Sequence, residues 1–466
     1  LQAAGLDPLH WQSDSVSAVL STLGRSNLLG SYLVLVIPLT AASTAQRQVR
    51  RRYLPLLAGQ VLCLLLTRAR AAYLGLAVTA LLGLVLWKVE PRAERGVRAA
   101  APFAGLAPAL TLAVAFVVSH VNPLAERIAA HGGSAAARTA IWSHVLPLVG
   151  ARPLWGYGPE TLAPLFERVF PPQLVYYHGR GVYVDRAHNL GLDLALGAGF
   201  FGLIALGALL GWAMWRLWQP SQAGLTPTAR AMRIALTAAI VGHCVDLCFS
   251  FDLTGGATVF YLLLALAAAF PAVVAAPTAV TETAPSPVRP IAPRAWERLS
   301  GMGEEARYIP PILVVLGLIA ILSLRPLRAD TDLGLALQRG PTPAGLRSAE
   351  MSVSLMPREP TYRLAYAGLL VEAERFPEAE AQALAGVGLS PVEPRAWAPL
   401  AELYLAWADT DPMQLAPAEA AYNNAIRLAP NVAVYRTGLG LTLARQGRLT
   451  EAAWQWEKAV DLDATD

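Results

Sequence analysis

Long apolar segments constrain the fold of this chain more than any other feature. A helix needs about 20 predominantly apolar residues to cross the ~30 Å hydrocarbon core of a bilayer. We interpret eight segments as such spans, near residues 28–45, 53–67, 71–88, 100–119, 190–215, 232–250, 257–275 and 309–325. With 55% hydrophobic and 15% charged residues, the 466-residue chain is too apolar for an ordinary soluble protein. We therefore predict an all-α fold with a polytopic helical membrane domain.

Positive charge predicts how these spans are oriented. Lys and Arg are concentrated in four links, at residues 46–52, 88–98, 216–233 and 276–307. Cytoplasmic links of membrane proteins are enriched in Lys and Arg, so we assign these four to the cytoplasm. The other connections then lie outside: the 67–70 turn, the 120–189 loop, the 251–256 turn and everything after Arg325. The net charge of +4 follows from the inner arginines and does not indicate nucleic-acid binding.

The topology also predicts the domain organisation. The chain starts at Leu1 rather than methionine, and an outside location of residues 1–27 requires an odd number of earlier spans, so we expect N-terminal spans to be missing. The predicted parts are four spans (1–119), a large extracytoplasmic loop with a polar site (120–189), three spans (190–276), a cytoplasmic linker (277–307), a last span (308–325) and an extracytoplasmic repeat unit (326–466).

The C-terminal part has an internal repeat. Pro357, Pro391 and Pro430 each close a similar unit, 34 and 39 residues apart, which matches the period of the tetratricopeptide repeat. The register holds if about five residues around 409–412 are inserted within the middle unit. Similar residues then recur in all three units: Tyr366, Ala367, Leu370 and Ala379; Trp397, Leu400, Ala401, Tyr404, Ala418, Tyr422 and Ala425; Leu439, Gly440, Leu443, Ala452, Trp456 and Ala459. We predict an α-helical tetratricopeptide solenoid that binds a protein partner, with a weaker unit over 326–359; a nondescript helical bundle is the alternative.

A polar cluster at the entry of the 190–215 segment is the strongest indication of chemistry. It contains Asp185, Arg186, His188 and Asn189. A histidine held at a membrane surface beside arginines can act as a base or as a donor near a lipid head group. The alternative is a polar cap on a membrane helix. Asp185 is close enough in sequence to raise the pKa of His188 by stabilising the imidazolium.

Arginines on the predicted outer face form a second group of candidates. Arg68 and Arg70 occupy the short turn after residue 67, against the positive-inside trend, and Arg138 lies at the start of an amphipathic segment. A guanidinium fork donates paired hydrogen bonds to a pyrophosphate and keeps its charge. The alternative is that these side chains snorkel to lipid phosphates. In the helix that follows Arg138, three side chains are expected to face lipid: Ile141, Trp142 and Val145.

Other ionisable residues point to structure rather than chemistry. His243 and Asp246 lie three residues apart on one helix face within an apolar segment, and we expect them to pair with each other. Two carboxylate pairs, 330–332 and 409–411, have a spacing used by metal-dependent glycosyltransferases but no histidine nearby in sequence. We predict no metal site and no cofactor.

Four groups of motifs follow one another along residues 20–275. They are a Gly-x-x-Asn-containing segment at 22–33, Thr-Arg-Ala-Arg-Ala-Ala at 67–72, Arg-x-x-x-Trp at 138–142 with Pro-x-x-Gly-x-Gly at 153–158, and His-Asn at 188–189 with a glycine pattern at 197–202. Together they resemble the O-antigen ligase family, whose superfamily includes O-antigen polymerases and bacterial protein O-oligosaccharyltransferases. Ala69 and Ala71 depart from the Ser and Gly usual in that family, and Arg25 and Ser26 stand where Asn and Pro are common.

The resemblance implies a multi-pass protein of the bacterial cytoplasmic membrane that transfers a glycan from a polyprenyl-diphosphate carrier to an acceptor hydroxyl on a lipid or protein. It implies catalytic roles for His188, Arg70 and Arg138, without a metal. The residues expected to bind substrate are Arg68, Asn27, Asp185, Arg186 and Asn189. Two alternatives remain open: a polymerase that joins glycan repeats, and a non-catalytic scaffold that recruits envelope proteins through its repeats.

Overall fold

The computed structural model describes residues 25–46, 48–89, 134–178, 182–219, 225–275 and 324–463, together with residues 310, 313, 314, 317 and 318. The predicted span at 100–119, the linker at 277–307 and most of the last span lie outside the described residues. The chain divides into two compact units, one formed by Leu1–Ala163 and Gln173–Val280, the other by Pro164–Pro172 and Thr281–Asp466. Across the described ranges the secondary structure is helical and contains no strand, which confirms the all-α prediction for them.

Helices of the first unit match most of the predicted segments that can be compared. They are α1 (Ser26–Ser43), α2 (Arg50–Thr67), α3 (Arg70–Val89), α5 (Ser134–Ala151), α7 (Leu174–His178), α8 (Leu190–Leu217), α9 (Pro227–Leu247) and α10 (Thr254–Ala275), while α6 (Leu162–Arg168) runs into the second unit. By length and composition, α1, α3, α8 and residues Thr254–Ala272 of α10 can cross a membrane. The total of eight spans remains a prediction.

The helix α9 is displaced by a few residues from the predicted span at 232–250. The helix begins at Pro227, ahead of the predicted start at 232, because the Thr226 hydroxyl accepts the Ala229 N–H at the helix start and Pro227 favours the first turn. It ends at Leu247 rather than at 250. Thr226, a capping residue directly before a proline, indicates this helix start in the sequence. The prediction rested on the apolar pattern alone and did not include this signal.

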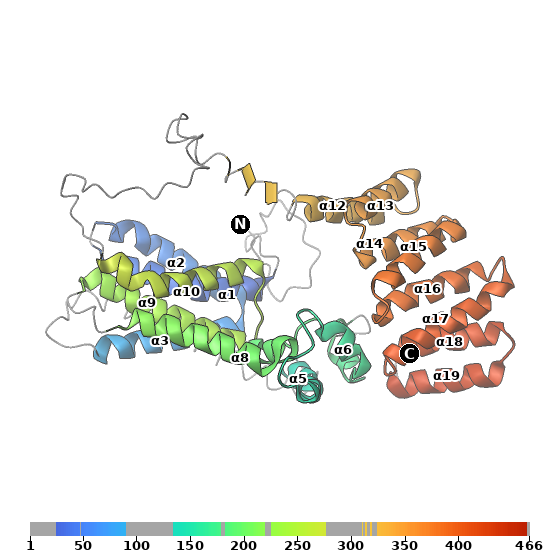
Figure 1. Cartoon of the computed structure of the whole chain (residues 1–466), viewed down its shortest axis with the longest axis horizontal. Helices are drawn as coiled ribbons and strands as arrows, with labels where there is room; N and C mark the ends of the chain where they lie inside the picture. Colours follow the sequence, from blue (N-terminus) through green and yellow to red (C-terminus); the bar gives the residue numbers. More distant parts are fainter. Residues whose placement is uncertain are drawn as a thin grey trace, which may run out of the picture. The chain divides into compact units, whose positions relative to one another are not determined.

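The core of the first unit lies around α9. This helix packs against both α1 and α3, and α1 also packs against α2 (Figure 1). Small residues of α9 make this packing close, since Ala235, Ala238 and Ala239 are fully buried. Helices in membranes associate largely through such small residues, because lipid tails are as apolar as the side chains they would replace. The remaining long helices, α8 and α10, pack against each other.

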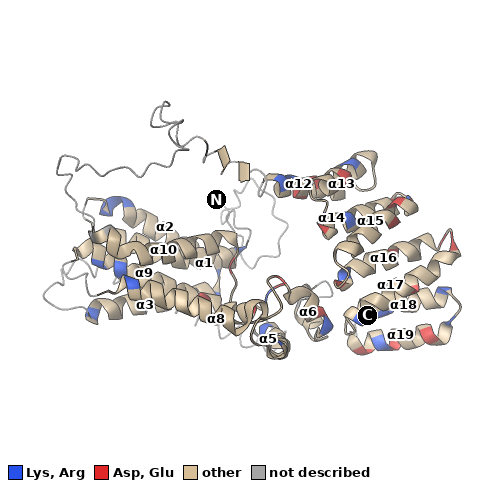
Figure 2. Cartoon of the chain, viewed as in Figure 1, with Lys and Arg blue, Asp and Glu red and all other residues tan. Residues whose placement is uncertain are grey.

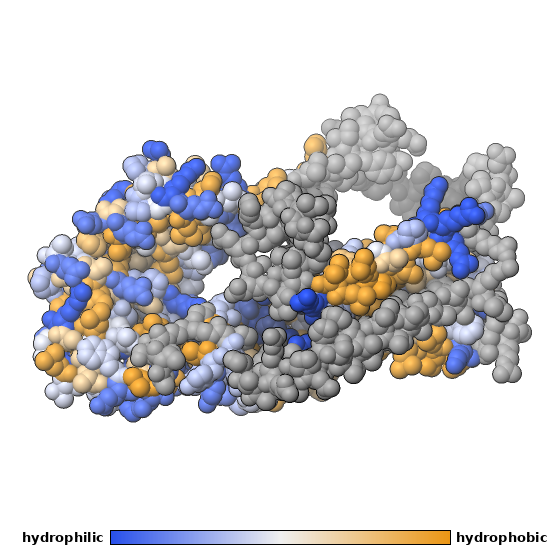
Figure 3. Space-filling view, turned by 180° about the vertical axis from the view of Figure 1, so that it is seen from behind, coloured by the Kyte–Doolittle hydropathy of each residue, from blue (hydrophilic) through white to orange (hydrophobic). Residues whose placement is uncertain are grey.

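Much of the apolar surface of the first unit is exposed (Figure 3). α8 buries only a few of its side chains, and the exposed fraction reaches 51% for Trp212 and 61% for Trp215. Large contiguous apolar surfaces are rare on soluble monomers and mark sites of contact with lipid or protein. Together with the four long apolar helices, this surface indicates a membrane protein.

Basic residues assigned to the cytoplasm gather at one end of the first unit. The positively charged ends of α2, α3 and α9 lie together in Figure 2. They comprise the start of α2, the last turn of α3 and the start of α9, with Arg50, Lys88 and Arg230 as examples. This grouping is consistent with the positive-inside assignment, which remains a prediction.

Consecutive helix pairs form the described part of the second unit. They are α12 (Arg325–Arg339) with α13 (Pro343–Leu355), α14 (Pro360–Glu372) with α15 (Phe376–Leu389), α16 (Pro394–Trp407) with α17 (Leu415–Leu428), and α18 (Ala433–Arg445) with α19 (Leu449–Leu462). Each pair also packs against the next (Figure 1). A short 3₁₀ helix, η8 (Pro412–Gln414), lies between α16 and α17, where the five-residue insertion was expected.

Equivalent contacts recur in the three units defined by their prolines. A side chain six residues after each closing proline donates to that proline's carbonyl oxygen: Arg363 to Pro357 at 3.0 Å, Trp397 to Pro391 at 3.0 Å, and Arg436 to Pro430 at 3.4 Å. Most of the predicted packing residues are buried, although Trp456 keeps 38% of its surface exposed. The helix pairs are thus present in the predicted register, while their assignment to the tetratricopeptide family remains a prediction.

The predicted outside location of the repeats can be tested by thiol labelling. Met413 is 82% exposed between α16 and α17, so a Met413→Cys variant should react with a membrane-impermeant thiol reagent in cells whose outer barrier has been opened. Gln48→Cys, at an exposed position in the predicted cytoplasmic link, should react only after lysis. The parent chain, with free Cys63, Cys244 and Cys248, gives the background. Labelling of Met413→Cys only after lysis would reverse the orientation.

Candidate active site

His188 lies immediately before α8 in an unusual backbone conformation. Its φ of 56° is in the left-handed region, which is uncommon for a residue with a side chain. The next residue, Asn189, caps α8: its side-chain oxygen accepts the Leu192 N–H at 3.0 Å, and its amide donates to the Cys248 carbonyl at 2.9 Å. Both polar ends of Asn189 therefore stabilise the fold, and its predicted contact with substrate remains a prediction.

A clamp on the neighbouring Ala187 holds His188 in this conformation. The Ala187 N–H donates to the Asp193 carboxylate at 2.7 Å, and its carbonyl oxygen accepts the Trp142 indole N–H at 2.7 Å. Ala187 itself is fully buried. A strained backbone conformation persists only where its surroundings determine it, and these two hydrogen bonds supply that constraint. Asp193 was missed in the sequence, although an acidic residue in the first turn of a predicted apolar helix is a recognisable signal.

The hydrogen bonding of His188 defines its tautomer. Its Nδ1 lies 3.1 Å from the carbonyl oxygen of Arg186. A carbonyl oxygen only accepts hydrogen bonds, so Nδ1 carries the proton and the neutral ring presents the lone pair of Nε2. The ring also packs edge to face against Phe251, with 5.0 Å between centroids. The imidazole is thus oriented to accept a proton at Nε2.

The pKa of His188 is lowered from its ordinary value, chiefly because burial disfavours the imidazolium. Arg138 and Arg25 lower it further through their positive charges, while the Arg186 carbonyl and the negative charge of Asp185 act in the opposite direction. Asp185 thus acts on this pKa in the expected direction, although the pKa is lowered overall. Its influence is smaller than the effect of burial.

Arg70 and Arg138 lie within electrostatic reach of each other and of the histidine. Arg70 begins α3, directly after the α2–α3 turn in which Arg68 has a φ of 56°. Arg138 is on α5, and its pKa is lowered by burial and then by the positive charge of Arg70, while Asp246 acts in the opposite direction. Neither arginine forms an ion pair with any residue that the structure describes. The fold thus brings together the three predicted catalytic residues.

Arg25 joins this cluster, although the sequence reasoning did not select it. It directly precedes α1, and its positive charge reaches His188. The available signal was its place in the first motif, where it departs from the usual family pattern. Asn27 lies nearby in the first turn of α1, and Arg68 is exposed at the end of α2.

The side of α5 that follows Arg138 faces protein rather than lipid. Ile141 is 3% exposed, Val145 is fully buried, and Trp142 forms its hydrogen bond with Ala187. The expectation that these three residues face lipid was therefore wrong. A helix that faces lipid and a helix that faces protein have the same periodic pattern, because an apolar face packs equally well against either surface.

The glycine motifs join the loop that follows α5 to a break in α8. The loop N–H groups of Tyr157 and Gly158 donate to the carbonyls of Leu196 and Gly197 at 2.7 and 2.9 Å. In return, the Phe200 N–H donates to the Pro153 carbonyl at 2.7 Å. Backbone groups freed by a broken helix at membrane depth need such partners.

Both close approaches in this arrangement require glycine. Gly199 breaks α8 with a φ of 65°, and a Cβ there would lie 2.2 Å from the Leu154 carbonyl oxygen. Gly156 has a φ of 66°, and its Cβ would lie 2.4 Å from the Leu196 carbonyl oxygen. Only glycine tolerates both the left-handed backbone and this contact. The two glycine motifs are thus complementary halves of one structural joint.

Acidic residues inside the unit have different partners from those expected. His243 Nε2 pairs with Asp252 at 2.8 Å, rather than with Asp246. Asp246 accepts a hydrogen bond from the Ser31 hydroxyl and is 1% exposed. The predicted His243–Asp246 pair was therefore wrong, because the loop after α9 returns Asp252 to the histidine. Asp246 is left to act on Arg138 across the helices.

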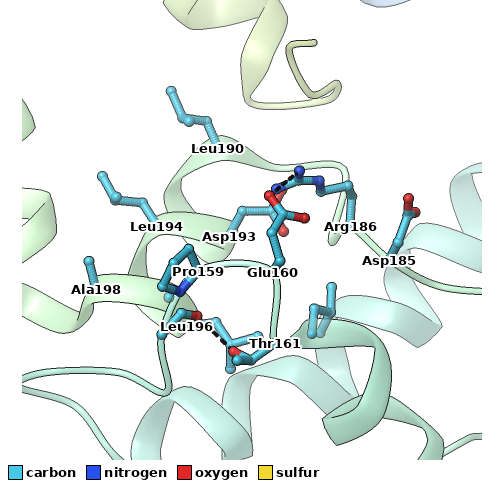
Figure 4. Close-up of a pocket in the computed structure, with 13 residues that line it drawn as sticks. Pro159, Glu160, Thr161, Asp185, Arg186, Leu190, Asp193, Leu194, Leu196 and Ala198 are labelled. Carbon is cyan, nitrogen blue, oxygen red and sulfur yellow. Dashed lines mark hydrogen bonds and ion pairs between the residues drawn. The ribbon is translucent and has the colours of Figure 1, made fainter. Parts of the chain in front are cut away.

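A cavity of about 400 Å³ lies beside the His188 segment (Figure 4). It is lined by 158–162, by Asp185 and Arg186, and by the first turns of α8, including Asp193. The Arg186 guanidinium donates to Glu160 at 2.6 Å across this cavity. Two of the predicted substrate-binding residues therefore share a cavity, but Arg186 already has a carboxylate partner. Among the described residues, no group of three or more His, Cys, Asp or Glu side chains could hold a metal ion.

Comparison with known proteins agrees with the motifs. Residues 55–207 match the family model described as O-antigen ligase. The matched segment includes Arg70, Arg138 and His188, the clamp residues Trp142 and Asp193, and both halves of the glycine joint. No curated protein matches the chain. The match supports the O-antigen ligase superfamily and, with the apolar helices, suggests a membrane protein with a ligase or glycosyltransferase activity.

The clamp on Ala187 predicts that Trp142 affects activity without touching the reacting atoms. In Trp142→Phe the buried carbonyl of Ala187 loses its donor, which costs roughly 1–3 kcal/mol. If the left-handed turn then relaxes, transfer should fall by about tenfold or more. Trp155→Phe, at a position 75% exposed, is the matched control and should keep the parental rate. An unchanged rate and an unchanged melting temperature for Trp142→Phe would contradict the clamp.

Proposed function

We propose that this protein transfers a glycan from a polyprenyl-diphosphate carrier to an acceptor hydroxyl at the outer face of the cytoplasmic membrane. The observation that carries the proposal is the cluster of Arg70, Arg138 and His188, which combines guanidinium groups that form no ion pair with the described residues and an oriented, half-buried imidazole. The family match over residues 55–207 supports the same class of reaction.

The arginines are suited to the leaving group. When the glycosidic bond to the carrier breaks, negative charge develops on the lipid diphosphate. Fixed cations that face this charge in a partly buried site stabilise it more than they would in water. Burial and then the positive charge of Arg70 lower the pKa of Arg138, so the close placement of the two guanidinium groups is electrostatically unfavourable without an anion. A diphosphate between them would relieve this repulsion and give each guanidinium paired oxygen acceptors.

His188 is suited to activate the acceptor. The acceptor hydroxyl must lose a proton as its oxygen attacks the anomeric carbon, and Nε2 of a neutral histidine can accept that proton. Burial and the neighbouring arginines favour the neutral ring, so the base is available near neutral pH. The proton on Nδ1 is held by the Arg186 carbonyl, which keeps the lone pair on Nε2. This argument favours a base over a diphosphate contact, for which the protonated ring would be better.

Arginine variants test the proposed diphosphate contact. In a strain that lacks the chromosomal gene, Arg70→Ala and Arg138→Ala should reach the membrane at parental levels but reduce transfer by roughly 100-fold or more. Arg→Lys at either position should rescue only partly, because Lys lacks the planar fork. Arg347→Ala, at an exposed position on α13, is the charge-matched control. Full activity of both alanine variants would exclude the diphosphate role.

The same deletion strain distinguishes the reaction types. Long glycan chains accumulating on the lipid carrier indicate a ligase, whereas single repeat units indicate a polymerase. A strain with no change in lipid-linked glycan would favour the scaffold alternative.

His188 predicts the pH dependence of transfer. A base works in its neutral form, so the rate should fall as pH drops through a pKa that lies below the ordinary value of 6.5. His188→Ala should be severely impaired while still binding the lipid donor. The measurement is the transfer rate of the purified protein against pH, with donor binding measured in parallel. A rate that instead falls with rising pH would assign His188 to the diphosphate, and a flat profile with an active His188→Ala would leave it as a helix cap.

A further inference from the structure

The second unit contains a short segment from a distant part of the sequence. Pro164–Pro172 belongs to the loop between α5 and α8, yet it clusters with the C-terminal helix pairs. The segment includes the end of α6 and carries Phe166, which is fully buried, and Phe170, which is 7% exposed. The two rings pack edge to face with 6.3 Å between centroids. Such buried aromatic pairs are typical anchors of peptide recognition.

A buried carboxylate follows the first anchor. Glu167 is 5% exposed and pairs with the Arg395 guanidinium near the start of α16. Burial raises the pKa of Glu167, and the hydrogen bond and positive charge of Arg395 act against this rise. An ionised carboxylate leaves water only where a partner compensates for its desolvation. Arg395 is therefore the residue that makes the burial of Glu167 possible.

Two further contacts come from the next helix pair. The side-chain amide of Asn431, between α17 and α18, donates to the Phe170 carbonyl at 3.1 Å. The Tyr435 hydroxyl, on α18, also interacts with the Glu167 carboxylate. The segment is thus held through its backbone and through its charged side chain, by residues from two successive units of the repeat. Recognition of an extended or irregular peptide by neighbouring repeats is the usual way in which solenoids bind.

We propose that the C-terminal helical repeats bind the segment Pro164–Pro172 of the same chain as their ligand, through the Glu167–Arg395 pair and the amide of Asn431. The repeats then bind this protein's own loop. The surface around Arg395 and Asn431 is therefore already occupied and is not free for an external envelope protein. The proposal concerns the partner of the repeats and does not depend on the proposed transfer reaction.

Limited proteolysis of the full-length protein tests the proposal. Trypsin cleaves after Arg168, whose side chain is exposed within the segment, but cleavage requires the local backbone to open. In the parent protein this bond should be cleaved slowly. Glu167→Ala and Arg395→Ala should each accelerate cleavage by roughly tenfold or more, because each removes the ion pair that holds the segment. Rates are measured from the fragment masses and divided by the rate for the same denatured variant.

A double-mutant cycle shows whether the two residues act as a pair. The Glu167→Ala/Arg395→Ala variant should be cleaved no faster than the more sensitive single variant, since residues in direct contact are not additive. Asn431→Ala should also accelerate cleavage, through a separate hydrogen bond. Arg375→Ala, which removes an exposed ion pair with Glu378 on α15, is the matched control and should leave cleavage after Arg168 unchanged.

Three results would overturn the proposal. The first is fast cleavage of the parent protein after Arg168, as expected for an unbound loop. The second is single variants that behave like the parent, or effects of Glu167→Ala and Arg395→Ala that multiply in the double variant. The third is a combination of two observations: Arg395→Ala is cleaved faster but also throughout α16 and α18, and Asn431→Ala is cleaved at the parental rate. This combination would indicate unfolding of the repeats rather than release of a ligand.

Discussion

The geometry of the candidate site depends on the joint between the 153–158 loop and the broken helix α8. A helix that breaks in an apolar environment leaves backbone groups without partners, and the loop supplies them through hydrogen bonds such as that from Phe200 to Pro153. This joint connects the loop after α5, the helix that carries Arg138 and Trp142, to the break in α8, the helix that follows His188. Arg138 and His188 are 50 residues apart in sequence. Their relative position therefore depends on backbone contacts that other residues make, those of the 153–158 loop and of α8.

Charge in the site is unbalanced in a way that favours an anionic substrate. Arg25, Arg70 and Arg138 act on one another or on His188, and the acidic group that reaches Arg138 is Asp246, buried among helices α1 and α9. Among the residues that the structure describes, this cluster of cations has few acidic neighbours, and such a cluster is costly to assemble from water. Burial and, after it, the same positive charges lower the pKa of His188 and so favour its neutral form. In the transfer that we propose, this one arrangement would provide cations for the leaving group and a base for the attacking hydroxyl.

Several residues near the candidate site have clear structural roles. Asn189 caps α8 and contacts the Cys248 carbonyl, and the glycines at 156 and 199 allow two backbones to approach. Trp142 and Asp193 hold the peptide of Ala187. Trp142 and Asp193 constrain the backbone next to His188, so their substitution is expected to affect the reaction through the position of the imidazole rather than by direct contact.

The sequence by itself determined most of the elements and selected the candidate residues for the proposed chemistry. Apolar length identified α1, α3, α8 and α10, the 34- and 39-residue spacing identified the helix pairs, and short motifs identified Arg70, Arg138 and His188. These features are local, because a span, a turn or a motif is defined by residues that are neighbours in the chain.

Only the tertiary structure decided which groups meet. It paired His243 with Asp252 rather than with its helix neighbour Asp246, turned Ile141 and Val145 toward protein, and placed Arg25 within reach of His188. It also made burial outweigh the charge of Asp185 in the pKa of His188. An apolar face does not specify whether lipid or protein covers it, and a charge does not specify its partner. Both depend on the packing of helices that are remote in sequence, since desolvation and Coulomb energy are properties of the assembled site.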